Sequence, residues 1–187
     1  RNGAKQALAK LKREPLVGWQ LGWTTKVLPH LDPPGALDLL EQLQVARIPI
    51  HVFHCVQAIS LCSRSAAWSE ALTALGMCKP WSAVAVNAAM AACANASQWR
   101  LALTLLQDMQ DEQIATAISF SSAINACAKA FLWQRSIHLL TEMQLNGFSR
   151  NTIAFNAALS SCAMGAQWQA ALGLFAAMAN KKLQKTT

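Results

Sequence analysis

Apolar residues recur at helical spacing in the C-terminal part of the chain. Three apolar residues of the segment IAFNAALSSCAM (153–164) stand at i, i+4 and i+7 along one helical stripe: Phe155, Leu159 and Cys162. The segment WQAALGLFAAM (168–178) resumes the same spacing, and Gly165 between the two segments is a typical helix stop. The pattern therefore predicts two antiparallel helices joined by a short turn.

This pattern repeats along the chain with three residue types in phase. Four tryptophans are spaced 31, 34 and 35 residues apart: Trp68, Trp99, Trp133 and Trp168. A cysteine stands six residues before each of them: Cys62, Cys93, Cys127 and Cys162. A methionine stands ten residues after each of the last three: Met109, Met143 and Met178. Periods in this range are typical of helical-hairpin solenoids, in which each unit buries its apolar face against its neighbours. We expect an all-α solenoid, with the tryptophans at the starts of second helices and packed between repeats.

The phase also predicts where the units begin and end. We expect a basic N-terminal helix or remnant repeat at 1–16, a degenerate repeat at 17–51, a short repeat at 52–82, and repeats at 83–116, 117–151 and 152–187, the last with a basic tail. The segment ALDLLEQL (36–43) matches the second-helix pattern and supports the degenerate repeat.

Composition and charge limit the function classes. Hydrophobic residues make up 53% of the chain and charged residues only 13%, about half the usual share of roughly 25%. The richest apolar stretch, residues 83–96, is mostly alanine with two asparagines, and it is shorter than the ~20 apolar residues of a membrane-spanning helix. The net charge of +7 comes from the two ends, because residues 14–180 carry eight basic and nine acidic side chains. The basic isoelectric point is therefore no argument for nucleic-acid binding.

The cysteines predict no chemistry of their own. The chain has six, Cys55 and Cys78 included, and no CxxC pair, so we expect free, buried thiols in a reducing compartment. His51, His54, Cys55 and Cys62 lie close in sequence but do not form a closed set of four metal ligands. No nucleophile elbow, phosphate-binding glycine loop or deaminase signature occurs. We expect no metal, no cofactor and no enzymatic activity.

Particular segments resemble a known family. INACAKA (124–130), TIAFNAALSSCA (152–163) and the apolar residues of the following helix resemble the pentatricopeptide repeat (PPR), and the spacings of 31 and 35 fit its short and long types. The resemblance is strong over residues 83–186 and weaker over 17–82. The tetratricopeptide repeat has a similar period but a different Trp, Gly, Tyr and Pro arrangement, and this chain has no Tyr. The resemblance implies a right-handed α-solenoid.

The resemblance also implies recognition of single-stranded RNA, one base per repeat. In the family, the fifth and last residues of a repeat face the base edge, and an apolar second residue packs against the base. Carried over, the residues fall in three groups: Asn87, Thr116 and Val84; Ser121, Asn151 and Ile118; Asn156, Thr186 and Ile153. Asn at the fifth position goes with pyrimidines, and Ser with Asn as the last residue goes with adenine. The expected element is 5′-pyrimidine–A–pyrimidine-3′.

The other units and the charges imply weak binding. The unit 52–82 offers Val56 with Ser82 and the unit 17–51 offers Leu21 with His51, and an aliphatic side chain cannot hydrogen-bond a base edge. Phosphate contacts would come from Arg64 and Lys129, and two cations provide little nonspecific affinity. The family resemblance implies a role in RNA processing or translation in the mitochondrion or chloroplast.

Two alternatives stay open. The asparagines and Ser121 are equally compatible with local hydrogen bonds inside the first helices. In addition, the scarcity of surface charge and the two units without base contacts favour a second hypothesis, a PPR-like scaffold subunit that binds protein within a large organellar assembly.

Overall fold

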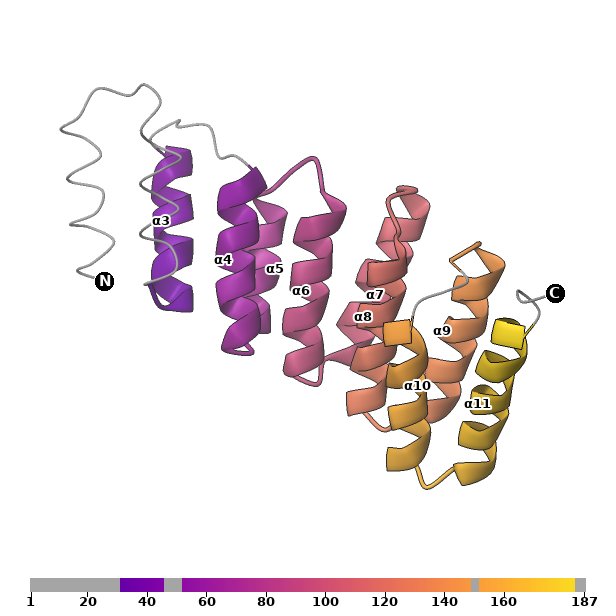
Figure 1. Ribbon diagram of the computed structural model, residues 1–187. Helices are drawn as coiled ribbons and strands as arrows, with labels where there is room; N and C mark the ends of the chain where they lie inside the picture. The colour runs from indigo at the N-terminus through magenta and orange to yellow at the C-terminus, as the bar shows by residue number, and fades with distance from the viewer. Residues whose placement is uncertain (1–30, 46–51, 149–151, 184–187) are drawn as a thin grey trace. The chain divides into compact units, whose positions relative to one another are not determined.

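Every regular element of the described chain is a helix. The computed structural model describes residues 31–45, 52–148 and 152–183, with side chains up to 176. The helices over these ranges (Figure 1) are α3 (Pro33–Val45), α4 (Val52–Arg64), α5 (Trp68–Gly76), α6 (Ala83–Asn95), α7 (Trp99–Asp111), α8 (Ala117–Lys129), α9 (Trp133–Leu145), α10 (Thr152–Met164) and α11 (Trp168–Leu183). The phased tryptophans each begin a second helix, α5, α7, α9 or α11, as the sequence predicts. None of the described helices is long and apolar enough to cross a membrane.

The chain divides into two compact units, residues 1–96 and 97–187. The first contains α3 to α6 and the second contains α7 to α11. The division falls between α6 and α7, two helices that the sequence assigns to one repeat.

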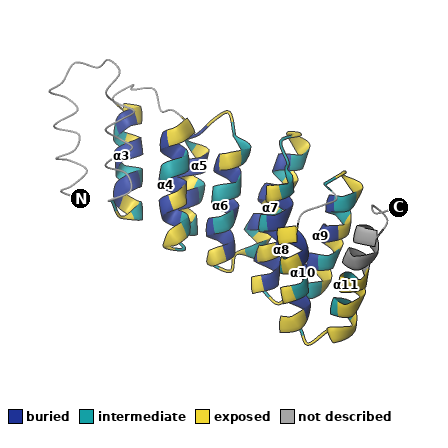
Figure 2. Cartoon of the chain, viewed as in Figure 1, coloured by how far each residue is buried: buried dark blue, intermediate teal, exposed yellow. Residues whose placement is uncertain are grey.

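In the first unit, α4 packs against both α5 and α6, and α3 packs against α4 and α5. Figure 2 shows the buried positions of these helices in dark blue. They carry large side chains, such as Leu40, Ile59, Leu75 and Met90, with alanines between them. Because alanine and cysteine lack bulk beyond Cβ or Sγ, neighbouring helices approach closely, and the leucines and methionines fill the remaining space. α3 spans the predicted second helix 36–43 and begins at Pro33, a residue well suited to a first helical turn.

In the second unit, α8 packs against α7, α9 and α10, and α10 packs against α9 and α11. α8 and α10 therefore contact each other, the second helix of their own hairpin and the second helix of the preceding hairpin. The phased Met109, Cys127 and Met143 are all buried here, together with Phe120. This order of contacts confirms the predicted all-α repeat fold of helical hairpins.

The hairpin turns use a left-handed residue that is not glycine. Ala66, Ser97, Phe131 and Ala166 each stand two residues before a phased tryptophan and have φ between 54° and 60°. In three of these turns the next residue donates its backbone N–H to the carbonyl of the phased cysteine at 2.9 Å, as in a Schellman motif. α10 ends at Met164, directly before the predicted helix stop Gly165, and the left-handed residue of this turn is Ala166 rather than the glycine.

Gly165 is instead explained by close approach. A Cβ atom at this position would lie 2.8 Å from Cδ1 and 3.3 Å from Cγ of Trp133, in the preceding hairpin. Trp133 thus contacts the turn of the next repeat, and this contact confirms the inter-repeat role predicted for that tryptophan.

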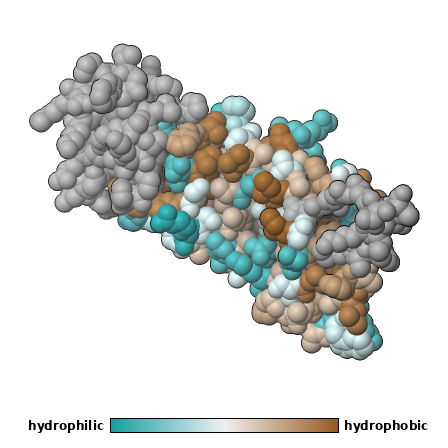
Figure 3. All heavy atoms as spheres, viewed as in Figure 1, coloured by the Kyte–Doolittle hydropathy of each residue, from teal (hydrophilic) through white to brown (hydrophobic). Residues whose placement is uncertain are grey.

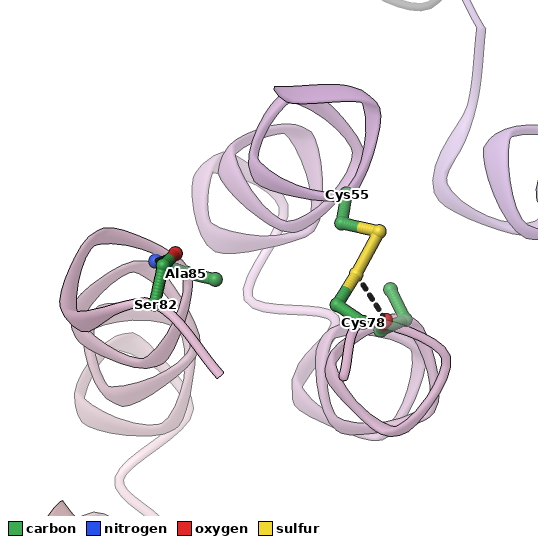
Figure 4. The surroundings of a disulfide bond; sticks show 5 residues. Cys55, Cys78, Ser82 and Ala85 are labelled. Carbon is green, nitrogen blue, oxygen red and sulfur yellow. Dashed lines mark hydrogen bonds between the residues drawn. A yellow bond between two sulfur atoms is a disulfide. The ribbon is translucent and has the colours of Figure 1, made fainter. Parts of the chain in front are cut away.

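The expectation of six free thiols is wrong for two of them. Cys55 on α4 and Cys78, just after α5, form a disulfide (Figure 4), with their Cα atoms 6.3 Å apart. Their sequence separation of 23 residues gives no local signal, and folding back of α5 along α4 brings them together. Cys62, Cys93, Cys127 and Cys162 are free and buried, as predicted.

Candidate nucleic-acid interface

Three first helices expose an aliphatic side chain at their second residue. Val84 on α6, Ile118 on α8 and Ile153 on α10 are 63%, 63% and 71% exposed. Core positions of the same helices, such as Val86, Phe120 and Ala158, are almost fully buried. These are the side chains expected to pack against bases.

The expected base-edge residues follow one helical turn later. Asn87, Ser121 and Asn156 stand three residues after those aliphatic side chains, and positions i and i+3 share a helix face. α8 and α10 pack side by side in the second unit, so the structure brings two of the three sets together. The set on α6 belongs to the first unit.

The three polar side chains differ in environment. Asn156 is exposed, whereas Asn87 is half-buried and its Oδ1 is a buried acceptor without a hydrogen-bond partner in the described chain. Ser121 is only 6% exposed, and its hydroxyl donates to the backbone oxygen of Ala117 at 2.7 Å. A base contact at Ser121 would therefore use the hydroxyl oxygen as an acceptor, for example from an adenine amino group.

The last residues of the repeats act at helix starts. The Thr116 hydroxyl accepts from the backbone N–H of Ser119 at 3.3 Å, and the Ser119 hydroxyl accepts from the backbone N–H of Thr116 at 3.1 Å. This capping box begins α8, and Ser82 caps α6 in a similar way by accepting from Ala85. The Thr116 hydroxyl thus has a structural role that competes with base contact. Asn151 and Thr186, like Leu21 and His51, lie outside the described residues.

The expected phosphate contacts are at the opposite ends of the first helices. Arg64 and Lys129 are exposed in the last turns of α4 and α8, where a positive charge also interacts favourably with the helix dipole. At the matching position of α6, Asn95 donates to the backbone oxygen of Ser63 at 2.9 Å and joins the ends of α6 and α4. α10 carries Met164 there, so two of the four described first helices have a cation at this position.

The sequence interpretation overlooked Phe53. It is the second residue of α4, 31 positions before Val84, and it is partly exposed. Its ring is the only aromatic one at this position among the described first helices. The same spacing that selects Val84, Ile118 and Ile153 also selects Phe53, which could stack on a base.

A different surface lies on the second helices of the second unit. The ring of Trp99 has the guanidinium carbons of Arg100 and Arg135 at 4.4 and 5.6 Å from its centroid. Neither guanidinium pairs with a carboxylate within the part of the chain that the structure describes. Beside them is a hollow of about 380 Å³, lined by Leu103, Gln134, Arg135, His138 and Leu139.

Apolar atoms are also exposed elsewhere on the surface. Figure 3 shows hydrophobic atoms on the visible face, between hydrophilic ones, over each unit. An apolar hollow of about 650 Å³ is on α10 and α11, where Trp168, Leu172 and Phe175 are exposed. No group of His, Cys, Asp and Glu side chains within the described ranges could hold a metal ion.

Comparison with known proteins agrees with this geometry. The class of protein that the fold defines is a helical-repeat protein built from stacked hairpins. The family model for the PPR repeat matches residues 84–114 and 118–148. No curated protein matches the chain. The chain therefore carries two pentatricopeptide repeats, and such repeats are a nucleic-acid-binding helical fold.

Proposed function

We propose that this chain binds single-stranded RNA along the starts of its first helices, one base per repeat. The observation that carries the proposal is the recurring pair on α6, α8 and α10, an exposed aliphatic side chain followed one turn later by Asn or Ser. Core packing explains the buried apolar side chains of these helices, but it does not explain three exposed aliphatic residues at the same repeat position. A base inserted between successive aliphatic side chains would cover that apolar surface.

The pairs support a short recognition element. Asn87 and Asn156 favour pyrimidines and Ser121 favours adenine by the rules of the family, which gives 5′-pyrimidine–A–pyrimidine-3′. Phe53 adds a stacking surface next to Val84, because α4 and α6 pack side by side in the first unit. Arg64 and Lys129 supply few phosphate contacts, so the affinity is low and most of it comes from the bases.

A specificity exchange at Asn156 tests the proposal. Asn156 is exposed, so Asn156→Ser leaves the fold intact, and it should shift the preference at the third base from pyrimidine to purine. The probes are fluorescent oligouridine RNAs that carry a central UAU or UAA, measured by fluorescence anisotropy. The ratio of the two affinities should change by about tenfold, the range of one base contact.

Two controls accompany this exchange. Gln169→Ala changes an exposed residue on α11 and should leave both affinities unaltered. Lys129→Gln should weaken the binding of both RNAs alike, and it should reduce the steepness of log affinity against log salt concentration by about 0.7. If wild type binds all RNAs equally, or binds none, base recognition by these repeats is wrong.

The proposal includes no catalysis, because the PPR family is generally non-enzymatic. We place the protein in RNA processing or translation of a mitochondrion or chloroplast, because PPR proteins are commonly organellar.

A protein-binding scaffold is the second candidate function. Arg100 and Arg135 lie beside Trp99 and pair with no carboxylate of the described residues, and the hollow next to them is lined by Leu103 and Leu139. This arrangement favours a partner segment with a carboxylate beside an aliphatic side chain. A photo-crosslinking residue at Gln134 should then capture protein, and one at Ile153 should capture RNA. RNA adducts at Gln134, or protein adducts at Ile153, would reverse the assignment of the two surfaces.

A further inference from the structure

The disulfide-bonded cysteines occupy two core positions of the repeat. Cys55 stands seven residues before Cys62, and the residues seven before the other phased cysteines are Val86, Phe120 and Phe155. Cys78 stands ten residues after Trp68, where the later repeats carry methionine. In the repeat of α8 and α9, the corresponding Phe120 and Met143 are both fully buried. The short repeat thus has a pair of sulfur atoms where its neighbours have a large apolar pair.

The position of this pair makes it important for the short hairpin. α5 has nine residues, whereas α7 and α9 have thirteen each, so the second helix of this repeat offers less surface for packing. The disulfide joins the chain just beyond the end of α5 to the first turn of α4 (Figure 4). Cys55 is 1% exposed and Cys78 is 6% exposed, so the sulfurs are part of the core of the first unit.

The reduced form of the pair is also accommodated. Sγ of Cys78 lies 3.1 Å from the backbone oxygen of Ala74, which would accept a hydrogen bond from the thiol. Reduction therefore leaves the Cys78 thiol with a hydrogen-bond acceptor, and the stability lost on reduction is mainly that provided by the covalent cross-link.

The other cysteines behave differently. Cys62, Cys93, Cys127 and Cys162 are buried on separate first helices and bonded to no other cysteine. Burial raises the pKa of Cys62, Cys93 and Cys127 to about 11, so these thiols are protonated and unreactive at neutral pH. Any thiol–disulfide exchange is thereby directed to one pair.

We infer that Cys55 and Cys78 form a redox-controlled cross-link that sets the stability of the first unit. Reduction needs a dithiol reductant: one of its thiolates attacks a sulfur of the disulfide, the S–S bond breaks, and the released thiolate takes up a proton. The second thiol of the reductant then resolves the mixed disulfide, which leaves two protein thiols and an oxidised reductant. Since the sulfurs are buried, exchange proceeds through local opening of α5 from α4.

Release of the cross-link affects the neighbouring repeat. α4 packs along α6, so looser pairing of α4 with α5 also weakens the support of α6. This inference goes beyond RNA binding and does not depend on it. The disulfide closes a loop between two cysteines 23 residues apart. Loss of this constraint on reduction is expected to favour the opening of α5 from α4 by roughly a hundredfold.

The test compares the whole chain in oxidised and reduced form. The chain is equilibrated with glutathione disulfide or with dithiothreitol, and peptide mapping by mass spectrometry counts free thiols, with four expected after oxidation and six after reduction. Hydrogen exchange should be about a hundredfold faster in α4 and α5 of the reduced chain, and the thermal midpoint should fall by on the order of 10 °C. Exchange in α8 and α9 should be unchanged.

Substitutions separate the cross-link from packing. Cys55→Ser with Cys78→Ser should behave like the reduced chain under both conditions. Cys55→Phe with Cys78→Met restores the apolar pair of the later repeats and should make stability independent of the redox condition. If the serine variant does not fold, the wild-type comparison still decides. The inference is wrong if glutathione disulfide leaves six free thiols, or if reduction of the pair leaves both exchange and midpoint unaltered.

Discussion

Replacement of Gly165 by alanine probes the contact that joins one repeat to the next. The added Cβ would meet two ring atoms of Trp133 at 2.8 and 3.3 Å and the backbone oxygen of Ser161 at 3.4 Å. The first distance is shorter than any ordinary carbon–carbon contact, and an indole ring between two helices cannot move as freely as the end of a long side chain. The ring or the turn must therefore shift.

The magnitude follows from two opposing effects. Overpacking of this kind costs about 1–3 kcal/mol. Loss of backbone freedom in the unfolded chain favours alanine by about 0.4–1 kcal/mol. Gly165→Ala should therefore lower the free energy of unfolding by about 1–2 kcal/mol, measured by urea unfolding followed by circular dichroism.

Gly173 provides a matched control in the same repeat. It lies inside α11, and a Cβ there would have no neighbour within 4 Å. Gly173→Ala should stabilise the chain by about 0.5–1 kcal/mol, because glycine is a poor helix former. The two substitutions thus have opposite expected signs for the same chemical change.

A double variant identifies the partner. In a Trp133→Leu background the ring is absent, so Gly165→Ala should become nearly neutral, and the coupling energy should be about 1 kcal/mol or more. If Gly165→Ala is as stable as wild type, or if its cost is the same without the ring, Trp133 does not pack on this turn.

Caps, buried hydroxyls and buried thiols allow three further predictions. Thr116→Ala should lower the free energy of unfolding by about 1 kcal/mol because the capping box is lost, and Thr116→Ser should retain most of the stability. If wild type and both variants unfold at the same urea concentration, Thr116 does not cap α8. The Ser136 hydroxyl donates to the Ser161 hydroxyl at 3.1 Å in the core, so Ser136→Ala should lower the free energy of unfolding by about 1–3 kcal/mol. The double variant Ser136→Ala/Ser161→Ala should lose less than the sum of the two single variants. Urea unfolding in which the two losses simply add would contradict this hydrogen bond. Burial raises the pKa of Cys93 from 9.0 to about 11, so stability should fall as pH rises from 9 to 11. Each such thiol contributes about 1.4 kcal/mol per pH unit, and Cys93→Ala should remove that share of the slope.

The candidate site could be predicted only in part from the sequence. Repeat register selects Val84, Ile118 and Ile153, and the structure places all three on the surface. Register does not indicate how far a polar side chain is exposed, and Asn156 is exposed whereas Ser121 is buried at an equivalent position. That difference depends on how closely each helix is covered by its neighbours. Recognition of RNA by these positions stays a prediction.

The elements themselves were determined by the sequence. A 3.6-residue apolar period and the four tryptophans at helix starts are local features, and a helix forms or ends according to residues within one or two turns. The spacing of 31 to 35 residues then indicated stacked hairpins, because a unit of that size cannot bury its apolar stripe alone.

Only the tertiary structure decided which stripes meet. The Cys55–Cys78 disulfide and the contact of Trp133 with the Gly165 turn join residues that are distant in sequence. The division after residue 96 separates two helices that are neighbours in sequence. A helical stripe specifies which side of a helix is apolar, but not which atom of a neighbouring helix will contact it. That choice depends on the fit of side chains across the whole unit, since protein interiors are close-packed.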